Sequence, residues 1–104
     1  MKDLLGQELK VGDYVASIEV YRGSCDAILH LVTGKTNAKV KILKLRTVID
    51  ELKGEPVSEW QQREKEKAKT PTRIVKVSPE NAKESLGDVN FQLIEKEVRS
   101  EMIG

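Results

Sequence analysis

The pair Gly12-Asp13 stands directly before YVASIEVY (14–21), the first run of this chain that can form a buried strand. Side chains alternate along the run with a period of two, which is typical of a strand with one buried face. Glycine tolerates a positive φ and aspartate accepts hydrogen bonds from nearby amides, so the pair predicts a tight turn. This turn would let the segment ELKV (8–11) fold back and direct the chain into a sheet.

Three further segments predict strands. The first, CDAILHLV (25–32), is apolar on both faces, whereas AKVKILKL (38–45) alternates between buried and solvated positions. The alternation slips by one position at 43–45, which predicts a β-bulge there. The last is TRIVKV (72–77). Together the four strands favour a mainly β fold.

The chain between the third and fourth strands changes character. We expect TVIDELKGEP (47–56) to be a connection without regular structure. The segment SEWQQREKEKAK (58–69) predicts a solvent-exposed, charged helix, with Ser58 and Gln61 as its capping box.

Two helical segments are predicted after the last strand. SPENAKESLG (78–87) has a serine N-cap, a proline at the first helical position and a glycine stop. The stretch 88–103 fits two patterns, and we favour the helical one. The helical stripe would be Phe91, Ile94, Val98 and Met102, and the strand pattern would be Val89, Phe91 and Leu93.

The opening LLGQELKVGDYV (4–15), with VTGKTNAKVKI (32–42) and TRIVKV, resembles the small Src-homology-3-like β-barrel proteins of tailed bacteriophages. Those proteins share an opening of the form L-G-Q-[ED]-[IL]-K-V-G-D-x-V and a later strand with Thr before alternating basic residues. The opening matches here at 5–13 and Val15. The later strand matches at Thr36, Lys39, Val40, Lys41 and Ile42.

This chain departs from the family pattern in two ways. His30 stands at about the position of an expected glycine, and neither 47–70 nor the C-terminal tail has a counterpart. The resemblance implies an Src-homology-3-like barrel with a core of 4–46 and 71–78, an inserted charged helix in 47–70 and a helical tail at 79–104. It also implies a phage origin and a non-enzymatic accessory role, and it transfers no functional residues.

Composition bounds the class of protein. A chain of 104 residues is one domain, and 38% apolar with 34% charged residues indicates a small core under a charged surface. The net charge of +1 argues against coating nucleic acid through bulk charge. Cys25 is the single cysteine, which excludes an internal disulfide. Without a signal-peptide or membrane-spanning run, we expect a soluble protein of the infected bacterial cytoplasm.

Basic residues concentrate in and around the third and fourth strands. The stretch 33–46 holds five basic residues and no acidic one, and 72–77 adds two. These seven residues, here called the basic strip, are Lys35, Lys39, Lys41, Lys44, Arg46, Arg73 and Lys76. If both strands lie in one sheet, the strip would suit phosphates of nucleic acid or a nucleotide, or an acidic protein surface. The other interpretation is that these side chains only solvate an exposed face.

Trp60 lies in an otherwise charged segment. Only Val57, Trp60 and Ala68 are apolar there, which is too few for a self-sufficient helical stripe. Trp60 therefore either docks its helix onto the barrel or is presented to a partner as an interface anchor.

The residues that could perform chemistry do not form a recognisable site. Cys25 and His30 are five positions apart on one strand, so they point to opposite faces, and there is no second histidine. The segment VTGKT (32–36) lacks the first glycine of a phosphate-binding loop, because position 29 is leucine. We therefore expect no catalytic residues, no metal and no cofactor.

Two function classes stay open. In the first, which we favour, the protein binds and modulates or inhibits a host protein, such as a defence or transcription factor, through Trp60 and the charged helix. In the second, the basic strip binds nucleic acid or sequesters a nucleotide signal of host defence. No membrane partner is expected, and the sequence does not decide whether the chain forms a homo-oligomer.

Overall fold

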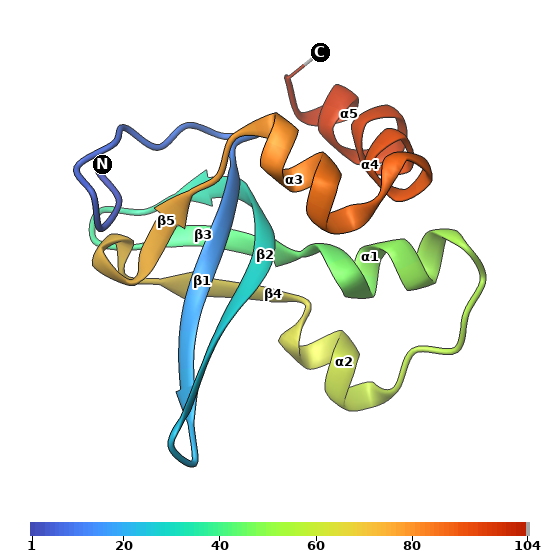
Figure 1. The fold of residues 1–104 in the computed structure, drawn as a ribbon, viewed down its shortest axis with the longest axis horizontal. Coiled ribbons are helices and arrows are strands. Elements are labelled where there is room, and N and C mark those ends of the chain that lie inside the picture. The colour runs from blue at the N-terminus through green and yellow to red at the C-terminus, as the bar shows by residue number, and fades with distance from the viewer. Residues whose placement is uncertain (104) are drawn as a thin grey trace.

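A five-stranded antiparallel sheet organises the chain in the computed structural model, which describes residues 1–103 (Figure 1). The strands are β1 (Tyr14–Tyr21), β2 (Ser24–Lys35), β3 (Val40–Lys44), β4 (Glu66–Lys69) and β5 (Ile74–Lys76). Their order across the sheet is β4-β3-β2-β1-β5. The outer strands β4 and β5 do not pair with each other, so the sheet is open. The protein is thus mainly β with added helices.

The predicted turn before β1 is confirmed. Gly12 has φ 94°, a conformation that side chains with a Cβ rarely adopt. The Asp13 carboxylate accepts a hydrogen bond from the Lys10 amide at 2.8 Å, and the Asp13 amide donates to the Lys10 carbonyl at 3.1 Å. The Gly12 amide also donates to the Val32 carbonyl at 2.8 Å, which ties the turn to β2.

The irregularity of the β2–β3 pair lies elsewhere than predicted. Its register shifts between Val32 and Gly34 in β2, whereas β3 is regular through Lys44. The alternation slips at 43–45 because Leu45 already begins a helix. The predicted bulge in the third strand is therefore wrong.

The segment expected to be a connection contains helix α1 (Leu45–Leu52). Leu45, Val48 and Ile49 are buried in this helix, while Leu52 is exposed at its end. These residues follow the i, i+3, i+4, i+7 spacing of an amphipathic helix. Assigning Leu45 to the third strand and 47–56 to a connection divides this pattern and hides it. The segment 47–70 thus contributes to the core.

The charged helix is shorter than predicted. Helix α2 (Glu59–Glu64) has the expected capping box between Ser58 and Gln61. The rest of the predicted helix forms β4, which pairs with β3 from Val40↔Lys69 to Leu43↔Glu66. Pairing satisfies the outer backbone groups of β3, and this tertiary gain exceeds the helix propensity of EKAK.

The chain reaches β5 through a 3₁₀ turn (Pro71–Arg73) and then becomes helical. Helix α3 (Pro79–Leu86) has the predicted Ser78 cap and ends at Gly87. The helical prediction for the tail is confirmed. It comprises α4 (Asp88–Ile94), a π-helical turn (Glu95–Arg99) and α5 (Ser100–Ile103), and the predicted tail's Gly104 lies outside the described residues.

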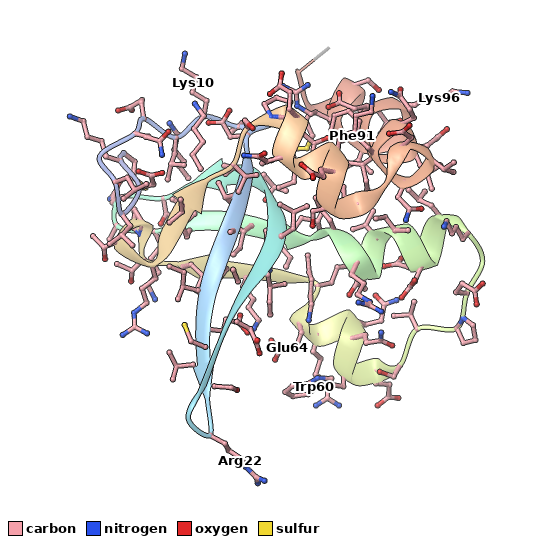
Figure 2. The ribbon with its side chains drawn as sticks, viewed as in Figure 1. Lys10, Arg22, Trp60, Glu64, Phe91 and Lys96 are labelled. Atoms are coloured by element: carbon pink, nitrogen blue, oxygen red, sulfur yellow. The ribbon has the colours of Figure 1, made fainter. Side chains whose placement is uncertain are left out.

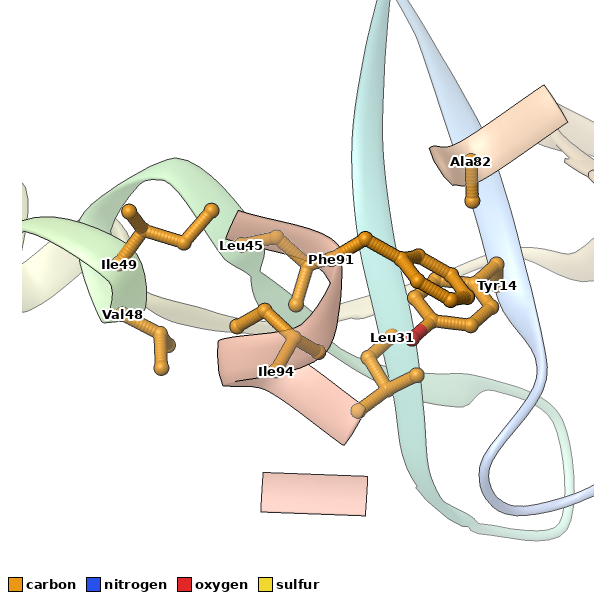
Figure 3. Close-up of a cluster of buried hydrophobic side chains, with 8 residues drawn as sticks. All are labelled: Tyr14, Leu31, Leu45, Val48, Ile49, Ala82, Phe91 and Ile94. Carbon is orange, nitrogen blue, oxygen red and sulfur yellow. The ribbon is translucent and has the colours of Figure 1, made fainter. Parts of the chain in front are cut away.

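Side chains of the sheet and of helices α1, α3 and α4 pack into one hydrophobic cluster (Figure 3). Within it, the rings of Tyr14 and Phe91 stack with centroids 5.6 Å apart. The cluster comprises Tyr14, Leu31, Leu45, Val48, Ile49, Ala82, Phe91 and Ile94. Because strand side chains alternate between faces, the neighbouring residues Val15 and Val32 serve a different cluster.

The second cluster lies on the opposite face of the sheet and is smaller. It comprises Leu9, Val15, Val32, Val40, Ile42 and Ile74, with Met1 packed against it. The N-terminal segment closes this side, since the Asp3 carboxylate accepts a hydrogen bond from the Lys76 amide at 2.7 Å. Among the described residues, no helix is long and apolar enough to cross a membrane.

Farther along this second face, charged side chains replace the apolar ones. The Glu19 carboxylate on β1 lies 3.5 Å from the Lys67 ammonium and 3.7 Å from that of Lys69, both on β4. Two strands separate β1 from β4, a distance of about 14 Å in a flat sheet. The long side chains and the twist of the sheet bring these charges together.

Candidate functional site

The first group of predicted binding residues surrounds the β2–β3 hairpin. Lys39 and Lys41 are exposed, and Lys39 closes the hairpin through its backbone, since its amide donates to Thr36 Oγ1 at 3.2 Å. Lys35 is partly engaged, because its ammonium donates to the Leu9 carbonyl at 3.1 Å. This end of the basic strip is therefore a solvated hairpin.

The second group lies on the other side of the sheet. Arg73 belongs to the 3₁₀ turn before β5, and β5 is separated from β3 by β1 and β2. Lys76 already has partners. Its ammonium lies 3.5 Å from the Asp13 carboxylate, and it donates a hydrogen bond to the Glu8 carbonyl at 3.4 Å. Both predicted strands share one sheet, but the expectation of one continuous basic strip is wrong, because two strands stand between its halves.

The third group lies where β3 runs into α1. Lys44 and Arg46 line a cleft of about 640 Å³ between β2, α1 and the ends of α3 and α4. Lys53, at the C-terminal end of α1, lies on the same cleft together with Asp50. Arg46 and Lys53 therefore lie with the Asp50 carboxylate around a single opening. The Lys44 side chain follows Val40 and Ile42 onto the opposite face of β3, near His30 and Glu64.

Trp60 does not dock its helix onto the sheet. Its side chain is 66% exposed, and no residue of α2 is buried. In Figure 2 Trp60 lies on the outer surface of α2, and Glu64 extends from the same helix. Of the two interpretations of Trp60, the structure is consistent with presentation to solvent.

His30 is a packed residue. It is 1% exposed, and its Nδ1 lies 2.8 Å from the Ile28 carbonyl oxygen. Burial lowers the pKa of His30, which the hydrogen bond to Ile28 only partly opposes. Cys25 is exposed at the far end of the same strand. Within residues 1–103 no group of three or more His, Cys, Asp or Glu residues could hold a metal ion.

Lys53 and Asp50 were missed as candidate site residues because α1 itself was missed. Read as a connection, 47–56 gives no reason to place Lys53 near Arg46. As a helix, the spacing of Arg46, Asp50 and Lys53 at i, i+4 and i+7 puts all three on one face. The apolar spacing of α1 was the signal that would have found them.

Residues 1–77 match the model of a family described as Domain of unknown function (DUF7205). The chain belongs to this family. The match includes all five strands together with α1 and α2, and it ends just after β5, so helices α3 to α5 lie beyond it. A comparison with curated proteins finds no match, and a comparison with solved structures finds none. Family membership by itself assigns no activity to the cleft or to Trp60.

Proposed function

We propose that this chain is a non-catalytic phage accessory protein that binds and modulates or inhibits a host protein in the cytoplasm of the infected cell. The observation that carries the proposal is the exposure of Trp60. Tryptophan is enriched among residues that dominate protein–protein binding energy, and burying its side chain removes a large apolar area from water. Here it is 66% exposed on a helix without any buried residue.

The surroundings of Trp60 suit a polar rim around an apolar anchor. Arg63 and Glu59 form an i, i+4 ion pair of 3.5 Å on the same helix, and both side chains are largely exposed. A charged rim around a buried aromatic is the usual anatomy of a protein interface. The partner would thus be a folded protein with an apolar pocket bordered by polar groups.

The same proposal includes an Src-homology-3-like architecture. Its support is the opening turn at Gly12-Asp13 and the reach of Glu19 on β1 to Lys67 and Lys69 on β4. Ion pairs across two strands fit a sheet that coils towards one face as a partly open barrel does.

The test is capture of partners from host lysate by the tagged protein and two variants. We expect Trp60→Ala to weaken partner binding by about thirtyfold or more, the effect of losing an interface hot spot. Val89→Ala is the matched control, because Val89 is 76% exposed on α4. Circular dichroism should show that both variants remain folded. Capture that is equal for wild type and Trp60→Ala would contradict the proposal.

The second candidate, a phosphate-bearing ligand on the basic strip, is favoured by the solvent exposure of Lys39 and Lys41. Reversing both to glutamate should leave the fold intact, since Val40 and Ile42 carry the burial of β3. If this candidate holds, the reversal abolishes binding of nucleic acid, wild-type binding weakens steeply as salt rises, and Trp60→Ala has no effect. We favour the protein partner because the strip is discontinuous and contains no aromatic residue for base stacking.

A further inference from the structure

A cleft opens at the start of α1. Its volume of about 640 Å³ falls in the range of small-molecule sites. Strand β2 forms one wall, α1 the second, and the ends of α3 and α4 the third. In Figure 1 the same elements surround the point where β3 continues into α1.

The two cations that α1 brings to this cleft have no ion-pair partner. Arg46 and Lys53 form no ion pair with any described residue, whereas the Lys76 and Lys67 ammonium groups do. Two like charges held around one opening repel each other, and a bound anion removes this repulsion. Asp50 offsets one of the two charges, so the opening keeps a net positive charge that suits an anionic ligand.

Two further features of the cleft narrow the chemistry of the ligand that would fit it. Part of the wall is apolar and consists of Leu29, Ile49 and Leu86, which favours a ligand with an apolar or aromatic group. Asn90 also lines the cleft. Its Nδ2 donates to the Leu86 carbonyl at 3.0 Å, but its Oδ1 is buried with no hydrogen-bond partner. A buried acceptor without a partner is costly, and a ligand that donates a hydrogen bond would satisfy it.

We propose that this cleft binds a phosphate monoester of about the size of a mononucleotide. The phosphate would lie between the Arg46 guanidinium and the Lys53 ammonium group, and the apolar body would lie against Leu29, Ile49 and Leu86. Arginine presents a planar fork that matches phosphate oxygens, and lysine adds point charge. The site goes beyond the protein-binding proposal, because Trp60 does not line the cleft. It shares Arg46 with the basic strip but also depends on Lys53.

The experiment titrates the ¹⁵N-labelled protein with three phosphate monoesters, AMP, UMP and p-nitrophenyl phosphate, and follows backbone amide shifts. We expect at least one ester to bind saturably and to shift the amides at 44–46, 53 and 90. Adenosine lacks the phosphate charge, and inorganic phosphate lacks the apolar or aromatic group. Each should bind at least about tenfold more weakly than the ester, as expected when both parts of the ester contribute to the binding free energy.

Two double variants make the result specific. Arg46→Gln with Lys53→Gln should weaken ester binding by about tenfold or more, since both residues are exposed at the rim and their loss spares the fold. Lys10→Gln with Lys96→Gln removes the same number of charges from exposed positions outside the cleft (Figure 2), and it should leave the affinity within about twofold.

The proposal fails if none of the three esters binds saturably, if the shifts map outside the cleft, or if the two double variants weaken binding equally. Tighter binding of oligo-dT than of any ester, lost on reversing Lys39 and Lys41, would also overturn it in favour of the strip. The Trp60 capture experiment is independent of all these outcomes, so a failure of one proposal leaves the other testable.

Discussion

His30 is buried in the sheet, and its surroundings decide whether its imidazole carries a charge. It lies opposite Val15 and Lys44 in the sheet, between an apolar cluster and the charged group around Glu19. Burial removes water from the imidazole and therefore disfavours its charged form. The consequence is a protein whose stability depends on pH.

We predict that the free energy of unfolding falls as the pH is lowered from 7 to 5. Burial lowers the pKa of His30 below its ordinary value of 6.5, so in this window the unfolded chain binds a proton that the folded protein does not. Urea unfolding at several pH values measures the effect. His30 is the only histidine, so His30→Gln should reduce the slope between pH 7 and 5. An identical slope in this variant would show that another group causes it.

At the scale of elements, α1 joins the sheet to the C-terminal helices. Leu45 is fully buried at its start and Leu52 is 41% exposed at its end, so one helix holds a core residue and a surface residue of the same type. The helix has no side-chain cap at Lys44. Its stability therefore depends on the packing of its apolar face more than on local signals.

We predict that Leu45→Ala lowers the free energy of unfolding by about 2–5 kcal/mol, through lost apolar burial and the cavity that remains. Leu52→Ala is the matched control and should cost less than about 1 kcal/mol. Chemical denaturation of both variants measures the difference. Equal losses in the two variants would show that α1 is not packed as described.

At the scale of the whole molecule, the tail is bound to the sheet by polar as well as apolar contacts. The Tyr14 hydroxyl donates to the Glu95 carboxylate at 2.8 Å, and Arg99 pairs with the same carboxylate at 3.0 Å. The Arg99 Nε also donates to the Gly12 carbonyl at 2.8 Å. Burial, followed by the hydrogen bond to Glu95, raises the pKa of Tyr14, so its hydroxyl stays protonated as a donor. These bonds hold the turn before β1 against residues more than 80 positions away.

We predict that removing residues 79–104 abolishes cooperative folding, although the family match ends at Val77. The deletion uncovers Tyr14, Leu31 and Leu45, which Phe91 and Ile94 cover in the full chain. Thermal unfolding followed by circular dichroism should lose its sharp transition, and the fluorescent dye ANS should bind the exposed apolar surface. A truncated chain that unfolds cooperatively at the same temperature as the full chain would contradict this prediction.

Local signals in the sequence determined the features that depend on neighbouring residues. The turn at Gly12-Asp13, the caps at Ser58 and Ser78 and the stop at Gly87 follow from backbone preferences and short-range hydrogen bonds. The periodicity also placed β1, β2, most of β3 and the tail helix. Each of these signals lies within one short stretch of neighbouring residues.

Only the tertiary structure decided the features that depend on distant partners. EKAK becomes β4 because the outer backbone groups of β3 need a partner, and TRIVKV joins β1 instead of extending a basic surface from β3. The cleft forms from β2, α1, α3 and α4, which are contributed by widely separated parts of the chain. Sheet order sets which charges share a surface, and no local pattern encodes that order, because pairing is chosen by the free energy of the whole packed molecule.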